Sequence, residues 1–578
     1  MKFSTLKLNP YFAAFLIIFS LSLIINYFAI PNMLSHDQLS QELILLKLSH
    51  QELFSQDAYF QDNGWKWVYN PWFPFLKLLT EYIGSLEETY RILIPISFFI
   101  FVFGMFLFFY NVGLNPVRNP AIPLIKNGAE NEADLRPSPP QSETNSLTFN
   151  GVNFFISVGV AVISSLYIPE VLLEDWGIGG PSYSRPRFLG LALITYAFWL
   201  FYKFGGKKNI PWLFLFIGLV GNIHVPTAFF VTMIFSITIL IDEKLTKNSL
   251  KKTVLGGMLA LAGISPFLIL HYWLYKAPPL IINDTASYIN ALQAAYPHLS
   301  WTGITNMYKD FFITRWYLFW PLFSLFWFML QKRRKTGQFN RLDKISIIAA
   351  SVIIISTIAI SIANQLLQYG FKKPPFTIQD PRIFRYIYFI LYLYFAFFLE
   401  WLWKELQQSK KKIIIISIAL IFLGTGGAII GYKKFNQVKR LLYLKKTFKD
   451  SGNTCRAPIY GWINANLNSN KVFLIDSNRY PPFRNCTRQN VVYTYRDSNY
   501  ITGMNYITEW HKRKMLIEDA YAQKNAGKII EIAKTYNADY IVSSKCIEFP
   551  SLKKLYEETY EDSLKENCIY SVRNLNDK

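Results

Sequence analysis

The sequence of 578 residues is poor in charged residues, which make up 17% of it, and in cysteine, of which it has four. Soluble domains average about 25% charged residues. An apolar content of 52% excludes a disordered chain, and four cysteines in a chain of this length exclude a disulfide-dense miniprotein. The sequence has no metal-ligand spacing, Walker motif or Gly-x-Ser-x-Gly turn. Any active site must therefore be assembled from residues that lie far apart in the chain.

Long apolar runs are what the sequence contains instead. A helix needs about 20 mostly apolar residues to cross a bilayer. The runs predict an α-helical polytopic membrane protein with about eleven transmembrane helices, two of them short crossings that meet in a polar hairpin within 210–241. The other predicted spans are 11–30, 91–112, 149–169, 188–202, 253–275, 316–330, 345–367, 383–403 and 413–432.

Lysine and arginine gather in the loops at 203–208, 244–252, 332–344 and 404–412. These loops and the N-terminus fall on one face only if 210–241 crosses twice, and the positive-inside rule places that face in the cytoplasm. The formal charge of +22 is thus explained by membrane topology, and we expect a lipid bilayer and no nucleic acid as partner. The composition, rich in Lys, Ile and Asn, favours a bacterial source of low GC content, and we expect the membrane to be the plasma (inner) membrane of a bacterium.

The chain divides by composition into a membrane domain at 1–432, an amphipathic interfacial helix at 433–449 and a small extracytoplasmic α/β domain at 450–578. Within the membrane domain, 31–90 is a long first outside loop. The segment 114–148, rich in Pro, Asn, Ser and Glu, is predicted to be a flexible cytoplasmic linker.

All four cysteines follow the last predicted span, which favours two disulfides in an oxidising compartment. Pairing of nearest neighbours gives Cys455–Cys486 and Cys546–Cys568, and four unpaired core cysteines are the alternative. In the same region, strands are predicted at 471–476, 490–495, 538–544 and 568–573, and a helix at 524–536 that ends at Asn537.

The first outside loop is acidic, with eight acidic residues against three lysines. Leu39, Leu43 and Leu46 recur at helical spacing, which predicts an amphipathic helix lying at the membrane interface. Trp65 and Trp67 supply aromatic surface suited to lipid headgroups or to a sugar ring.

Three carboxylates in this loop are candidates for chemistry. Asp37, which follows His36 at the outer end of the first span, could act as a general base whose pKa is raised by burial; it could also cap the helix that follows, and the two roles are compatible. Asp57 and Asp62 could bind a divalent cation or a sugar hydroxyl, or they could be part of a solvated acidic loop.

Outer-side basic residues are the second set of candidates. Arg185, Arg187, Arg382 and Arg385 could bind phosphate oxygens bidentately, or they could anchor spans against headgroups. His224 lies at the predicted break between two short helices, where a polar residue is either functional or a packing residue with a hydrogen bond.

The arrangement resembles the GT-C class of membrane glycosyltransferases, which includes the protein O-mannosyltransferases and the oligosaccharyltransferase catalytic subunit. The resemblance rests on an inside N-terminus, a first span ending in an acidic motif, a long first outside loop and an outside α/β domain. Three C-terminal motifs are similar to uncharacterised bacterial members: Gly461-Trp462-Ile463-Asn464, Phe483-Arg484 and Ala538-Asp539-Tyr540-Ile541-Val542.

The resemblance implies an inverting transfer of sugar from a polyprenyl-phosphate donor to an extracytoplasmic glycan, lipid or protein. It places Asp37 as base and Asp57 or Asp62 as second acid, and it leaves open a divalent cation as cofactor. Two features depart from the family: His36-Asp37-Gln38 replaces the usual paired acids, and a Trp-Trp-Asp motif is missing. The alternatives are a transporter or flippase of a lipid-linked or small anionic substrate, and a non-catalytic membrane assembly protein.

Overall fold

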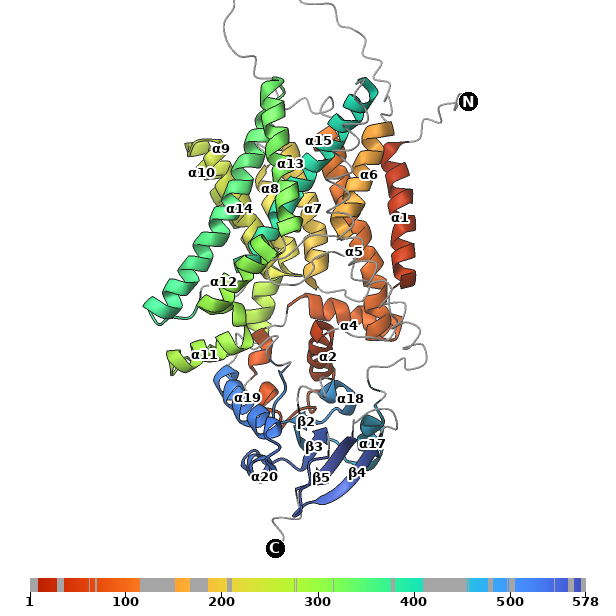
Figure 1. Ribbon diagram of the computed structural model, residues 1–578, viewed down its shortest axis with the longest axis vertical. Helices are drawn as coiled ribbons and strands as arrows, with labels where there is room; N and C mark the ends of the chain where they lie inside the picture. Colours follow the sequence, from red (N-terminus) through yellow and green to blue (C-terminus); the bar gives the residue numbers. More distant parts are fainter. Residues whose placement is uncertain are drawn as a thin grey trace, which may run out of the picture.

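The computed structural model describes most of the chain as helices, with a small sheet near the C-terminus (Figure 1). The described residues are 9–28, 36–61, 63–67, 70–114, 151–166, 186–204, 210–274, 276, 278–314, 316–375, 380–408, 455, 457–476, 482–495, 497, 505–544, 546–559 and 566–572. The predicted span at 413–432, the predicted helix at 433–449 and all but the first residue of the predicted linker lie outside them.

Five described helical segments are long and apolar enough to cross a membrane. They contain α5 (Leu86–Phe108, continued by a π-turn to Leu114), α9 (Val225–Asp242), α10 (Lys247–Ile269), α14 (Arg341–Gln365) and α15 (Ile387–Gln408, after the 3₁₀ turn η8 at Asp380–Tyr386). The other helices of the bundle are α1 (Pro10–Phe28), α6 (Gly151–Leu166), α7 (Pro186–Phe204), α8 (Ile210–Gly221) and α13 (Trp316–Lys335). Each predicted span before 413 therefore coincides with a helix.

The predicted break within 210–241 is present, because α8 ends at Gly221 and α9 begins at Val225. A Cβ atom on Gly218 would lie 2.2 Å from the carbonyl oxygen of Ala260, so glycine allows α8 to contact the backbone of α10. Asn222, between the two short helices, donates to the carbonyl of Gly263 (2.8 Å) and accepts from the amide of Phe267 (2.9 Å). Its polar side chain thus joins the hairpin to α10 beside Pro266, where the helix lacks one amide donor.

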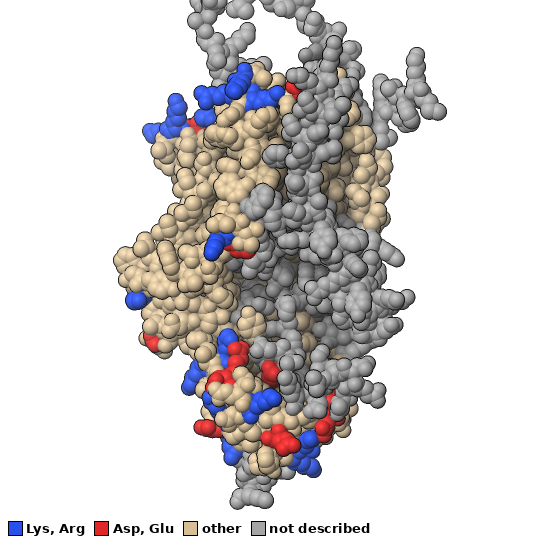
Figure 2. Space-filling view, viewed as in Figure 1, with Lys and Arg blue, Asp and Glu red and all other residues tan. Residues whose placement is uncertain are grey.

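Ion pairs join the turns at one end of the bundle. The carboxylate of Asp242, at the end of α9, contacts Arg341 (2.8 Å) and Lys344 (2.9 Å) of α14. Arg333 of α13 contacts Asp343 of α14 (2.9 Å). Figure 2 shows lysine and arginine gathered at this end, away from the C-terminal domain. The turns between α9 and α10 and between α13 and α14 therefore lie at the same end, as two crossings within 210–241 require; which side of the membrane it faces stays a prediction.

Several short helices lie between the bundle and the C-terminal domain (Figure 1). From the first loop come α2 (His36–Ser49), α3 (Ala58–Gln61), the 3₁₀ turn η1 (Gly64–Trp67) and α4 (Trp72–Ile83). The segment between α10 and α13 adds α11 (Thr285–Ala295) and α12 (Trp301–Lys309). Hydropathy did not predict α11 and α12, because they are too short to produce a long apolar run.

The C-terminal region folds around a five-stranded sheet in the order β2-β1-β3-β5-β4. The pairs β1–β2 and β1–β3 are parallel, whereas β3–β5 and β4–β5 are antiparallel. The elements are α17 (Pro458–Asn466), β1 (Val472–Ile475), α18 (Phe483–Thr487), β2 (Asn490–Val491), α19 (Ile507–Ala522), α20 (Ala526–Thr535), β3 (Tyr540–Ser544), β4 (Lys553–Thr559) and β5 (Glu566–Ser571).

The sequence predictions for this region are largely confirmed. Both disulfides have the predicted pairing, Cys455–Cys486 and Cys546–Cys568. The strand predicted at 490–495 shrinks to two residues, and β4 was not predicted because its sequence, KKLYEET, is strongly polar. Asn537 has a positive φ of 51° just after α20, as expected of a residue that ends a helix.

One apolar cluster fills the bundle, and a second connects the first loop to the C-terminal domain. The second contains Leu43 of α2, Trp72 of α4, Leu292 of α11 and Trp510 of α19. The C-terminal domain is therefore packed against the end of the bundle that carries α2 and α4.

Candidate functional site

The helix predicted at the membrane interface, α2, is buried in protein. Leu39, Leu43 and Ile44 belong to the apolar cluster shared with the C-terminal domain. In Figure 1, α2 runs from the bundle toward α18. Its apolar face is thus covered by the C-terminal domain and not by lipid, because that domain supplies the apolar partner that a local sequence pattern cannot identify. His36 and Asp37 form its first turn, and their side chains lie outside the described part of the structure.

Asp57 is buried in an ion pair with Arg484 of α18. Arg484 donates to both carboxylate oxygens of Asp57, from Nε (2.7 Å) and from Nη2 (2.8 Å), and it also contacts Asp497. The amides of Tyr59 and Val491 donate to the same carboxylate of Asp57. This geometry favours a structural role for Asp57 over the catalytic or cation-binding role that its loop position suggested.

The two carboxylates of this cluster stabilise the charged form of Arg484. Burial lowers the pKa of Arg484, but the carboxylates of Asp497 and Asp57 raise it above its usual value. The guanidinium is therefore charged at all ordinary pH values. The cluster joins the first loop to the C-terminal domain across 427 residues of sequence.

His224 and Arg385, both predicted as substrate-binding residues, meet at Thr227. His224 Nδ1 lies 2.8 Å from the hydroxyl oxygen of Thr227, and Arg385 Nη2 donates to that same oxygen (3.0 Å). Arg385 also donates to the hydroxyl of Tyr386 (3.0 Å), and it is only 1% exposed. The sequence did not single out Thr227, although its position three residues after a histidine at a helix start was a usable signal.

Neighbouring elements enclose this cluster, called the Arg385 cluster below and consisting of His224, Thr227 and Arg385. A Cβ atom on Gly190, one turn into α7, would lie 3.3 Å from Cβ of His224. Phe384, beside Arg385, packs edge-on against Phe311 after α12 (ring centroids 5.3 Å apart). The cluster thus lies where α7, α9, η8 and the end of α12 come together.

Among the remaining predicted site residues, the structure describes the side chains of Arg382 and Trp65. Arg382 is partly buried in η8, one turn before Arg385. Arg187 lies in the first turn of α7, but its side chain, like that of Trp67, lies outside the described residues, as do Arg185 and Asp62. Trp65 is buried and packs against Phe60, so it is not an exposed sugar platform; its indole nitrogen has no partner among the described residues.

A buried polar stripe on α14 was missed by the sequence reading. Residues on one face of α14 and of the π-turn that follows it are polar and buried: Thr357, Ser361, Asn364, Gln365 and Gln368. Gln365 and Gln368 both donate to the carbonyl of Leu299, and Ser361 lies 3.0 Å from the hydroxyl of Tyr308. The stripe therefore holds α11 and α12 against α14. Its signal was the helical spacing of neutral polar residues, which a search for charged residues overlooks.

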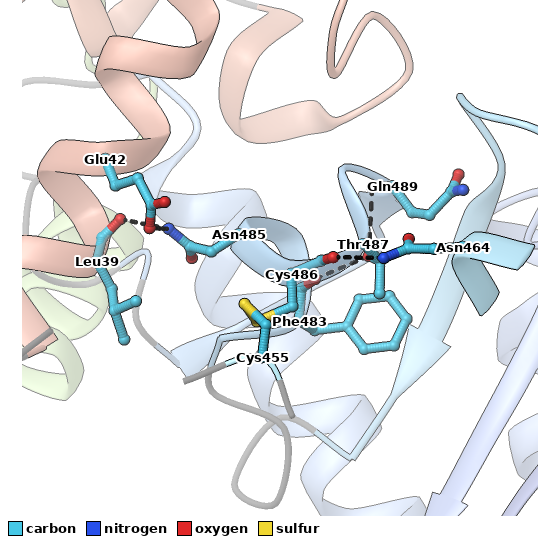
Figure 3. The surroundings of a disulfide bond; sticks show 9 residues. All are labelled: Leu39, Glu42, Cys455, Asn464, Phe483, Asn485, Cys486, Thr487 and Gln489. Atoms are coloured by element: carbon cyan, nitrogen blue, oxygen red, sulfur yellow. Dashed lines mark hydrogen bonds between the residues drawn. A yellow bond between two sulfur atoms is a disulfide. The ribbon is translucent and has the colours of Figure 1, made fainter. Parts of the chain in front are cut away.

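The carboxylate of Glu42 on α2 is another feature that the sequence did not single out. Asn485 Nδ2 donates to Glu42 Oε2 (2.6 Å) and to the carbonyl of Leu39 (2.9 Å). Figure 3 shows Asn485 reaching from α18, beside the Cys455–Cys486 disulfide, to these two groups of α2. Burial raises the pKa of Glu42 to about 7, against the lowering effect of the Asn485 hydrogen bond. A carboxyl group of this kind changes protonation near neutral pH.

Among the described residues, one group of side chains has the proximity of metal ligands: Cys546, Glu557 and Cys568. The two cysteines form a disulfide, so neither offers a thiolate. The described residues thus assign no place to the divalent cation that the sequence left open.

Among known proteins, solved structures are similar to this chain. The sequence matches no protein-family profile and no curated protein. The chain is similar to the oligosaccharyltransferase of Archaeoglobus fulgidus, crystallised with a tethered acceptor peptide containing the NVT sequon. The match covers 93% of this chain and 69% of the other, with 10% identity and a TM-score of 0.47. A likeness at this level does not identify an activity.

Proposed function

We propose that the protein is a membrane glycosyltransferase of GT-C type that transfers a sugar from a polyprenyl-phosphate donor to an extracytoplasmic acceptor. The observation that carries the proposal is the Arg385 cluster. A guanidinium, an imidazole and a hydroxyl converge within the bundle, at the end that faces α2 and the C-terminal domain. Buried ionisable side chains in a membrane bundle are costly and mark ligand sites.

The chemistry of the donor fits a guanidinium at this place. In the transfer, the bond between the anomeric carbon and the phosphate oxygen breaks, and its electron pair stays on the phosphate. Arg385, assisted by Arg382, would stabilise that developing charge in a site of low dielectric constant. The polyprenyl chain would remain in the bilayer beside the apolar helices.

The acceptor hydroxyl needs a base, and Asp37 in the first turn of α2 is our candidate. It would take the hydroxyl proton while the oxygen attacks the anomeric carbon from the face opposite the phosphate, so the configuration inverts. Asp57 has no part in this step, because Arg484 and two backbone amides occupy its carboxylate.

Release of polyprenyl phosphate from radiolabelled polyprenyl-phosphate sugars, by the full chain in nanodiscs, tests the proposal. Arg385→Met and Asp37→Asn are each expected to lower the rate of release at least ~100-fold. Arg334→Met makes the same substitution at an exposed arginine at the opposite end of the bundle and should leave the rate unchanged.

Two results would overturn the proposal. Undiminished release in the Arg385→Met protein would remove the cluster from the reaction. In sealed vesicles, movement of the intact donor across the membrane with no bond broken would identify a flippase.

A further inference from the structure

Helix α4 presents three different faces around its axis. Trp72, Phe73 and Leu76 are buried against the protein. Lys77 and Glu81 form an exposed polar face. The third face is apolar and exposed.

That third face consists of Phe75, Leu78 and Tyr82, which are 46%, 66% and 90% exposed. At 3.6 residues per turn these three side chains fall within ~60° of arc. They therefore form one stripe along the helix, which is called the α4 stripe below.

We propose that the α4 stripe is immersed in the bilayer interface at the end of the bundle that carries the C-terminal domain. A helix with one protein-facing, one polar and one apolar face is suited to the boundary between protein, water and lipid. The inference concerns membrane contact and does not depend on the proposed transferase activity.

The position of α4 favours lipid as the occupant. Figure 1 shows α4 running across the end of the bundle, whereas α1 and α5 run along its length. Gly84 and Ser85 join α4 directly to α5, a candidate membrane span. Ile92 and Ile96, in the first three turns of α5, are also exposed, so this span presents apolar surface close to its junction with α4.

Contacts on the buried face of α4 give this lipid contact a consequence. Trp72 Nε1 donates to Gln41 Oε1 of α2 (3.4 Å), and the hydroxyl of Tyr90 on α5 donates to the same oxygen. α4 and the start of α5 thus hold α2 in place. An α4 fixed at the lipid surface would therefore set the height of α2, whose first turn carries Asp37, relative to the bilayer.

Spin-label accessibility tests the inference on the full chain in nanodiscs. The native cysteines are paired, so a single added cysteine can be labelled selectively. Leu78→Cys and Tyr82→Cys report on the stripe, and Glu81→Cys reports on the polar face of the same helix. We expect the ratio of collision rates with oxygen, which enters lipid, to those with a water-soluble nickel chelate to be several-fold higher at 78 and 82 than at 81.

Equal ratios at all three positions would overturn the inference, because the stripe would then face water. A strongly immobilised label at 78 and 82 that neither reagent reaches would overturn it too, since another part of the protein would then cover the stripe. Wild-type protein treated with the same spin label is the control. It should take up no label if the native disulfides remain closed.

Discussion

Two arginines, Arg484 and Arg385, are almost fully buried, at 2% and 1% exposure, and they have different surroundings. Arg484 lies outside the bundle, between two carboxylates that arrive from the first loop and from the C-terminal domain. Arg385 lies within the bundle, and its contacts include the hydroxyls of Thr227 and Tyr386 and the ring of Tyr386.

The difference separates two uses of a buried guanidinium. Two carboxylates around Arg484 satisfy its donors with fixed opposite charges, which joins parts of the chain. Hydroxyls and a histidine lie next to Arg385, and the hydrogen bonds of its guanidinium to Thr227 and Tyr386 involve no carboxylate; in the proposed function this guanidinium binds the phosphate of the donor. Substitution at Arg484 should therefore affect stability, whereas substitution at Arg385 should affect ligand chemistry.

The largest expected effect on stability is at Arg484. Arg484→Met leaves the buried carboxylates of Asp57 and Asp497 without their cation and should lower the free energy of unfolding by about 3–5 kcal/mol. Denaturant unfolding of the full chain measures this. Asp57→Asn and Asp497→Asn added to Arg484→Met should recover much of the loss, and Lys554→Ala on exposed β4 serves as the neutral control. An unchanged midpoint in Arg484→Met would remove the distinction between the two arginines.

Loss of the Cys455–Cys486 disulfide should be nearly as costly. The bond closes a loop of 31 residues and lies two residues from Arg484, so it also fixes α18. Cys455→Ser with Cys486→Ser should lower the free energy of unfolding by about 2–4 kcal/mol. The matched control is Cys546→Ser with Cys568→Ser. It removes the Cys546–Cys568 disulfide, which closes a loop of 22 residues and does not lie next to Arg484 in the sequence. If the first pair alone loosens α2, measured by proteolysis within 36–49, the link through α18 is established; equal susceptibility in both would refute it.

Glu42 should make the contact between α2 and α18 depend on pH. Its pKa is about 7 in the folded protein against 4.5 as the reference, so the folded state binds the proton more tightly. The contribution of Glu42 to stability is thus fully present below about 4.5 and is lost as pH rises through about 7, by roughly 1–3 kcal/mol. Glu42→Gln should flatten this part of the stability profile, measured by unfolding at a series of pH values. A profile that keeps its slope in the variant would assign the pH dependence to other groups.

Thr227→Val should have the smallest effect, and on activity more than on stability. The valine keeps the shape of the side chain but removes the hydroxyl oxygen that accepts a hydrogen bond from Arg385 and lies within hydrogen-bond distance of His224. Donor cleavage should fall about 10-fold, the loss of one hydrogen bond to a charged group. Thr227→Ser should restore it; equal rates in all three proteins would show that Thr227 does not position Arg385.

Local patterns explain what the sequence predicted well. The break between α8 and α9 follows from the polar run before Pro226, and β1, β3 and α20 follow from apolar spacing and Asn537. The disulfide pairing followed from proximity in the chain. Each of these features is decided by residues close together in sequence.

Features decided by distant contacts were not predictable in the same way. Nothing near Asp57 indicates that Arg484 will meet its carboxylate, and the apolar face of α2 looks the same whether lipid or protein covers it. The Arg385 cluster is intermediate, because His224 and Arg385 were visible as candidates but their meeting at Thr227 depends on how α9 packs beside η8.

Binding of a short-chain polyprenyl phosphate to the full chain in nanodiscs tests the central claim most directly, because it measures capture of the phosphate without any sugar or acceptor. The account predicts affinity at least ~10-fold weaker in Arg385→Met than in wild type, and unchanged in Arg334→Met. Equal affinity in the wild-type and Arg385→Met proteins would contradict it.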